Sequence, residues 1–248
     1  LTTICVHITF LKTANIYFAL AMAFGCLIIF LAPPFTTPDE YTHYLNTCRV
    51  YNGYFFPNIQ NGVSGCYVTR SQLSYYQAFS NCFNGVDGLN FSYVQMYNLI
   101  SQKDNSDIVF YALGNSVINP MAYVVPAFFS KIISLLANGL SPYSLMISGK
   151  LANLLVSSLI IRKAIMVTGT LRNTMFLLSL MPMTIYQCAS LSYDAILIAG
   201  MFLLFAYITQ LIGSEEGYVA TITDICGMVV ACVCIFGTKY AYATIMLL

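Results

Sequence analysis

The sequence contains few charged residues, and this scarcity excludes most classes of soluble protein. Of the 248 residues only 8% are charged, whereas 58% are hydrophobic. An ordinary soluble domain carries roughly 25% charged residues. The mean hydropathy is +0.75, and we therefore predict a polytopic membrane protein. The net charge of +1 leaves no extended basic face, so nucleic-acid binding has no support.

Sequence motifs for nucleotides and metals are also missing. The sequence has no Walker loop, no GxGxxG and no GxSxG. Its two His and the lack of any CxxC pair argue against a structural zinc site. An active site on the external face would have no cytosolic nucleotide sugar available, so any sugar donor used there should be carried by a lipid.

The nine cysteines fall into two groups. Most lie inside apolar runs, where a cysteine behaves as a small hydrophobic residue. Cys48, Cys66 and Cys82 lie in a polar stretch instead. A bridge between Cys66 and Cys82 is open if that stretch faces an oxidising compartment, and the sequence does not decide it.

Apolar runs long enough to cross a membrane surround one long polar segment. The first run is Asn15–Ala32, and the polar segment that follows extends to about Asn119. The later runs are Pro120–Leu140, Tyr143–Ile161, Asn173–Leu191, Ala195–Ile212 and Val219–Gly237, and another begins near Tyr240. We expect part of a longer membrane protein. Its three regions are the tail and first transmembrane helix (1–32), an external subdomain (33–140) and a helix bundle (141–248).

The placement of Pro120–Leu140 decides which polar residues meet. Lys131 lies near its middle, where a lipid-buried lysine costs roughly 2.5–3.5 kcal/mol. A helix lying along the surface avoids this cost and also puts the basic loop from Arg162 to Arg172 on the cytoplasmic side. In that arrangement Asp39-Glu40 and the turn before Asp194 share the external face. The alternative is a plain span whose Lys131 faces the interior of the bundle.

Two adjacent carboxylates, Asp39 and Glu40, follow directly on the first span. Their structural interpretation is a capping box, in which Thr37 is the N-cap, Pro38 begins the helix and Glu40 stands third. Their functional interpretation makes Asp39 a general base or a ligand of a hard divalent cation, with His43 on the same helical face. The two interpretations are compatible, because the cap can fix Glu40 while Asp39 faces a cleft.

Further ionisable residues stand at the ends of apolar runs or inside them. Asp194 ends a short turn that begins at Ser190, and it is either a helix N-cap or a functional residue. Lys150 lies well inside an apolar run and must snorkel, pair with a carboxylate or meet an anionic ligand. Lys239 is similar, and both lysines would suit a lipid phosphate. Arg49 is a charge that an amphipathic surface helix usually carries.

Taken in order, these motifs resemble a bacterial family of predicted multi-pass membrane proteins named domain of unknown function 2142. The resemblance covers nearly the whole sequence and is carried by Pro33-Pro34, Pro38-Asp39-Glu40 with His43, Asn119-Pro120 with Tyr123 and Pro126, Gly149-Lys150 with Asn153, Ser190 to Ala195, and Lys239-Tyr240. That family is similar to the GT-C superfamily of integral-membrane glycosyltransferases. The resemblance implies an all-α polytopic fold with juxtamembrane helices at Tyr41–Tyr51 and Pro120–Leu140 in the first external loop.

The resemblance also implies a function in the bacterial cytoplasmic (inner) membrane. A sugar would pass from a polyprenyl-phosphate-linked donor to a glycan, lipid or protein acceptor of the cell envelope, as in polysaccharide biosynthesis. The implied catalytic residues are Asp39, Glu40 and Asp194, of which Asp39 and Glu40 are also candidate ligands of Mg²⁺ or Mn²⁺. The implied substrate-binding and phosphate-binding residues are Lys150, Lys239, His43 and Arg49. The rival hypotheses are a transporter or flippase of lipid-linked glycans and a non-enzymatic membrane scaffold.

Overall fold

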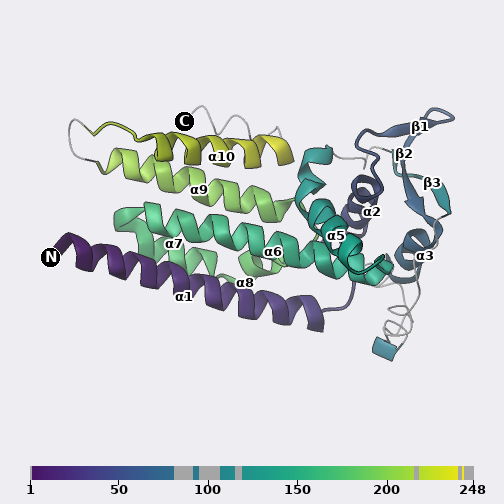
Figure 1. The fold of residues 1–248 in the computed structure, drawn as a ribbon, viewed down its shortest axis with the longest axis horizontal. Coiled ribbons are helices and arrows are strands. Elements are labelled where there is room, and N and C mark those ends of the chain that lie inside the picture. The colour runs from purple at the N-terminus through teal and green to yellow at the C-terminus, as the bar shows by residue number, and fades with distance from the viewer. Residues whose placement is uncertain are drawn as a thin grey trace. The chain divides into compact units, whose positions relative to one another are not determined.

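Most of the described chain is helical, with one small sheet (Figure 1). The computed structural model describes residues 2–80, 92–94, 107–114, 119–214, 218–239 and 242. The contacts within the chain divide it into two compact units. The first unit comprises Leu1–Cys26, Leu154–Ala189 and Asp194–Leu248, and the second comprises Leu27–Asn153 and Ser190–Tyr193.

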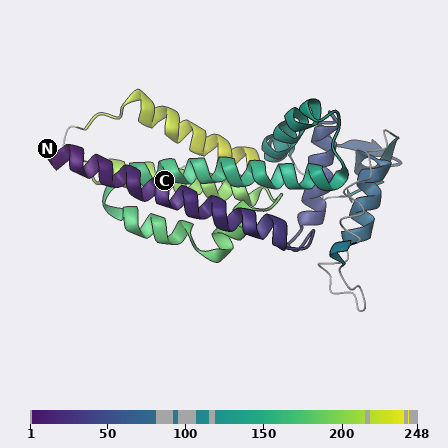
Figure 2. The same cartoon turned by 60° about the horizontal axis from the view of Figure 1, so that its bottom comes forward.

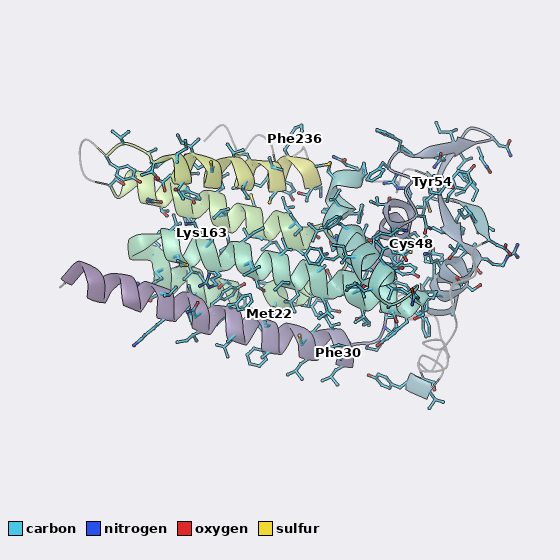
Figure 3. The ribbon with its side chains drawn as sticks, viewed as in Figure 1. Met22, Phe30, Cys48, Tyr54, Lys163 and Phe236 are labelled. Atoms are coloured by element: carbon cyan, nitrogen blue, oxygen red, sulfur yellow. The ribbon has the colours of Figure 1, made fainter. Side chains whose placement is uncertain are left out.

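Three helices in the described part of the chain are long and apolar enough to cross a membrane. They are Leu11–Leu31 within α1 (Thr2–Leu31), α6 (Pro142–Val167) and α9 (Asp194–Ile212). Each covers a span that the sequence predicted. Large apolar side chains such as Phe30 of α1 point outward from these helices (Figure 3). The protein is therefore a largely helical membrane protein, and its described residues contain three candidate spans.

The first unit pairs α9 with α10 (Ile222–Thr238), which lie side by side in Figure 1. Helix α10 begins with a capping box, because Thr221 Oγ1 accepts from the Asp224 N–H and Asp224 Oδ2 accepts from the Thr221 N–H. The hydroxyl oxygens of Thr168 and Thr209 lie 3.0 Å apart and form a hydrogen bond. This bond connects the residue after α6 to α9.

The predicted continuous span Asn173–Leu191 is wrong. The segment instead forms two short helices, α7 (Arg172–Ser179) and α8 (Pro182–Cys188), which are separate in Figure 2. Pro182 supplies the reason, because it has no N–H to bond to the preceding turn. It also disfavours helical geometry at the residue before it, and Met181 is extended at φ −58° and ψ 137°.

The prediction of an all-α fold needs a second correction, since the second unit contains a three-stranded antiparallel sheet. Its strands are β1 (Asn58–Gln60), β2 (Val63–Thr69) and β3 (Ile108–Ala112), in the order β1-β2-β3. Asn61 and Gly62 connect the first pair and both have positive φ, 50° and 77°. An Asn-Gly pair in this conformation is the preferred two-residue hairpin connection, so the signal for this turn was present in the sequence.

The remaining helices of the second unit pack around α2 (Glu40–Tyr51), which confirms the helix predicted at Tyr41–Tyr51. Helix α2 contacts β2, α3 (Arg70–Phe79) and α5 (Val124–Leu136), and a single turn, η3 (Pro120–Tyr123), precedes α5. Lys131 of α5 is exposed, and its ammonium lies 4.6 Å from the ring centre of Tyr51. This contact places the lysine against an aromatic face of α2, where a cation is stabilised.

Candidate functional site

The turn that leads into α2 gives Asp39 and Glu40 opposite surroundings. Asp39 is exposed and adopts the left-handed conformation, with φ 57° and ψ 7°. Asp is one of the few residues other than Gly that tolerate this region. Glu40 is completely buried and is the first residue of the helix. Asp39 makes no side-chain cap, and Thr37 contributes its carbonyl to the Glu40 N–H, so the predicted capping box is wrong.

Glu40 is not a cap because its carboxylate bonds to distant parts of the chain. Lys150 Nζ of α6 lies 3.0 Å from Glu40 Oε2, and the backbone N–H of Leu191 donates to Glu40 Oε1 at 3.1 Å. Both side chains of the ion pair are buried. A buried charge is tolerated only when it is paired and hydrogen-bonded, and here each carboxylate oxygen has such a partner.

The segment Ser190–Tyr193 is held by α6 as well as by Glu40. Asn153 follows Lys150 by one helical turn, so both side chains share a face of α6. Asn153 Nδ2 donates to the carbonyl of Ser190 at 2.9 Å and to that of Ser192 at 3.3 Å. The acidic motif and the turn before Asp194 therefore meet within the second unit, while the side of the membrane on which they lie stays a prediction.

A glycine allows this close approach of α6. A Cβ atom added to Gly149 would lie 2.6 Å from Leu191 Cδ2 and 3.2 Å from Pro126 Cβ. Any side chain at this position would press against both neighbours. Gly149 thus permits α6, the Ser190–Tyr193 segment and α5 to share one tightly packed corner.

His43 forms a second polar pair one turn along α2 from Glu40. Its Nδ1 lies 2.7 Å from the hydroxyl of Tyr123, and both side chains are buried. The ring of Tyr193 stands edge-on to the imidazole, with centroids 5.0 Å apart. An imidazole held by a hydroxyl and an aromatic ring is oriented for proton transfer or for binding a polar ligand.

Arg49 lies deep in the second unit and is fully buried. Burial lowers the pKa of Arg49, and the charges of Cys66 and Tyr123 oppose that shift. Burial raises the pKa of the Cys66 thiol to about 12, and nearby Arg49 reduces the increase. Cys82, the other cysteine of the possible Cys66–Cys82 bridge, lies outside the described residues.

The structure gathers five of the predicted site residues in the second unit, namely Asp39, Glu40, His43, Arg49 and Lys150. The other two belong to the first unit. Asp194 is the first residue of α9, and Lys239 follows α10 with its ammonium 5.4 Å from the ring centre of Tyr242.

A divalent cation at Glu40 is not favoured by the arrangement of charges. The Lys150 ammonium is only 3.0 Å from Glu40 Oε2 and would repel a second cation. Within the described ranges, no three His, Cys, Asp or Glu residues cluster as metal ligands would. The predicted role of Mg²⁺ or Mn²⁺ stays a prediction.

Sequence reasoning did not assign site roles to Tyr123, Asn153 and Tyr193. Each lies in one of the motifs that carry the family resemblance. Polar side chains inside apolar runs were a usable signal for Tyr123 and Asn153, because a buried polar group needs a partner. Tyr193 gave no such signal, since an aromatic residue at a helix boundary is common in membrane proteins.

Comparison with known proteins agrees with the membrane class. No curated protein and no solved structure matches the sequence. The family model described as predicted membrane protein (DUF2142) matches residues 22–248, which is most of the chain. The match includes the acidic turn, α2, the first half of α6 and the Ser190–Tyr193 segment. The protein therefore belongs to the DUF2142 family of predicted membrane proteins.

Proposed function

We propose that this protein is a membrane glycosyltransferase of the GT-C type. It transfers a sugar from a polyprenyl-phosphate-linked donor to a cell-envelope acceptor on the external face of the bacterial cytoplasmic membrane. One observation carries the proposal. Asp39 presents an exposed carboxylate from a left-handed turn, while its neighbour Glu40 fastens that turn to α6 and to Leu191.

In the proposed reaction Asp39 is the general base. Its carboxylate takes the proton of the acceptor hydroxyl, and the acceptor oxygen forms a bond to the anomeric carbon of the donor sugar. The bond between that carbon and the phosphate oxygen breaks, and its electron pair leaves with the polyprenyl phosphate. A base in this role contributes about 10²–10⁴-fold to the rate.

The other residues position the base and the substrates. Lys150 and Glu40 neutralise each other, so we assign Lys150 to positioning Glu40 in place of the predicted phosphate contact. His43 is buried and held by Tyr123, so we assign it to fixing the start of α2, and its predicted contact with substrate stays a prediction. Asp194 and Lys239 belong to the first unit, and their predicted roles stay predictions. This division supports the proposal because the rigid parts are buried and the reactive carboxylate is exposed.

The test is transfer of labelled sugar from polyprenyl-phosphate donors by purified protein in nanodiscs, with and without Mg²⁺ or Mn²⁺. Asp39→Asn should lower turnover by about 10²–10⁴-fold while the melting temperature is unchanged, because Asp39 is exposed. Asp107→Asn is the matched control, since it removes another exposed carboxylate from the same unit and should leave turnover unchanged.

Wild-type turnover in Asp39→Asn would contradict the assignment of the base. The buried Glu40–Lys150 pair also favours a second candidate, because transporters use paired charges along their pathways. Movement of labelled donor across the bilayer without sugar transfer would support a flippase. Absence of both activities would leave the scaffold hypothesis.

A further inference from the structure

The outer face of the sheet in the second unit carries a group of aromatic and amide side chains. In β2, Cys66 and Val68 are buried on the side of α2, and Tyr67 between them points to the opposite face. Tyr67 pairs with Phe110 of β3, so both rings lie on that opposite face. We call the surface formed by Tyr54, Asn58, Gln60, Tyr67 and Phe110 the aromatic face.

The rings of the aromatic face form a continuous group. The centroids of Tyr54 and Tyr67 are 5.0 Å apart with planes tilted by 39°, and Phe110 stands edge-on to Tyr67 at 5.6 Å. All three are half-buried, so part of each ring is open to solvent. Tyr54, labelled in Figure 3, enters this group from the segment after α2.

A glycine and a glutamine arrange these rings. A Cβ atom on Gly65 would lie 2.5 Å from Phe110 Cζ, so the ring of Phe110 lies directly over the bare backbone of β2. Gln60 Nε2 donates to the hydroxyl of Tyr67 at 2.8 Å. Asn58 lies on the same face, because it pairs with Gly65 in register. The face is thus a built surface with fixed rings and carboxamides beside them.

We propose that the aromatic face binds a neutral oligosaccharide. The faces of aromatic rings are electron-rich and attract the weakly positive C–H groups of a sugar ring. Carboxamides both donate and accept, so they match the hydroxyls along the edge of a sugar. The positions of β1, β2 and β3 that point to this face carry no charged side chain, which fits an uncharged ligand better than an acidic one.

A lipid surface is the competing occupant, because aromatic residues also gather at membrane interfaces. The carboxamides argue against it, since burying Asn58 and Gln60 in hydrocarbon would cost their hydration. Ile59 points to the other face of β1, whereas the exposed side chains of Val63 and Ile108 share the aromatic face by register. The carboxamides therefore decide between the two occupants, and the experiment below tests the lipid surface directly. The proposal concerns binding alone and does not depend on glycosyl transfer.

The experiment measures binding of cellohexaose and maltohexaose to the full chain in nanodiscs by saturation-transfer NMR, with hexagalacturonate as an acidic comparison. Binding of a neutral probe in preference to the acidic one is expected. Tyr67→Ala should weaken that binding by about tenfold or more, because it removes the central ring. Tyr67→Phe should weaken it only about two- to tenfold, because it loses a single hydrogen bond. Ile59→Ala, on the opposite face, is the matched control and should bind as the wild type does.

Several results would overturn the proposal. They are failure of the wild type to bind either neutral probe, unchanged binding in a Tyr67→Ala protein of wild-type melting temperature, and equal loss in Ile59→Ala. If Tyr67→Ala does not fold, Gln60→Ala replaces it and should weaken binding. A spin label at position 60 that is relaxed by membrane-dissolved oxygen rather than by an aqueous nickel complex would assign the face to the lipid surface.

Discussion

Two neighbouring carboxylates, Asp39 and Glu40, show how far position alone determines what a side chain can do. Exposed Asp39 remains available to solvent and substrate, whereas buried Glu40 depends on Lys150 for its charge to be tolerated. Replacing both members of a buried pair by neutral groups is often almost neutral for stability, whereas removing one member leaves an unpaired buried charge.

Lys150→Met should therefore destabilise the protein by about 3–5 kcal/mol. Adding Glu40→Gln to Lys150→Met should restore a large part of that loss, because the amide oxygen still accepts from the Leu191 N–H and no charge remains. Denaturation in mixed micelles measures both proteins and the Glu40→Gln single variant. A double variant no more stable than Lys150→Met would mean that the pair is not the source of the cost.

Cys66 gives a dependence of stability on pH in the reduced protein. Its pKa in the folded state is about 12, raised from an ordinary value of 9.0 by burial. Because the folded pKa is raised, the stabilisation is fully present below pH 9, where both states hold the proton. It is lost as pH rises from 9 toward 12, because only the unfolded chain ionises there. The melting temperature of wild type should fall more steeply than that of Cys66→Ala between pH 9 and 10.5. If the melting temperatures of the two proteins fall in parallel over this pH range, Cys66 does not cause the pH dependence.

At the scale of single elements, local rules predicted some boundaries and not others. The end of α2 agrees with Gly53, which follows the helix with a positive φ of 91°. Its start does not follow the predicted capping box, because the helix begins at Glu40 and not at Pro38. The break at Pro182 was available in principle, but the apolar length of Asn173–Leu191 was given more weight. Strand β2 lies in a polar segment without clear alternation, so its pairing with β3 depends on contacts that sequence patterns do not contain.

The sequence singled out individual residues of the candidate site, but it did not predict which of them contact one another. The acidic motif, Lys150 and the turn at Ser190 were each identified, because ionisable groups are expensive in a membrane. The pairing of Lys150 with Glu40 joins residues that are 110 positions apart, and no spacing rule reaches that distance. The sequence left Lys150 three options, which were to snorkel, to pair with a carboxylate or to bind an anionic ligand. The fold selects pairing with a carboxylate.

Gly149 is the position at which packing between elements can be tested. Gly149→Leu should push Leu191 and Pro126 away from α6 and lower stability by about 1–3 kcal/mol, despite the better helix propensity of leucine. Leu159→Ala, on an exposed part of the same helix, is the comparison and should change stability little. Melting temperatures in detergent measure both. A stability of Gly149→Leu equal to wild type would show that this corner is loosely packed.

At the scale of the whole molecule, topology is the open prediction. The basic loop after α6 favours the cytoplasm, and α6 is long enough to put its two ends on opposite sides. In a protein whose nine native cysteines have been replaced, an impermeant thiol reagent on intact cells should therefore label Gln60→Cys and not Lys163→Cys. Both positions are exposed. Lysed cells provide the control, since both should then react. Labelling of position 163 in intact cells would contradict the prediction and would place the loop after α6 on the external side.

The distance in sequence between Glu40 and Lys150 has a consequence for biosynthesis. The ribosome synthesises Glu40 before Lys150. Glu40 has therefore left the ribosomal exit tunnel before α6 is inserted into the membrane. An isolated lysine raises the cost of inserting a helix by roughly 2.5–3.5 kcal/mol. The carboxylate of Glu40, which is synthesised earlier, can pair with Lys150 while α6 is being inserted. The order of the two residues along the chain thus makes the partner of Lys150 available before α6 is made.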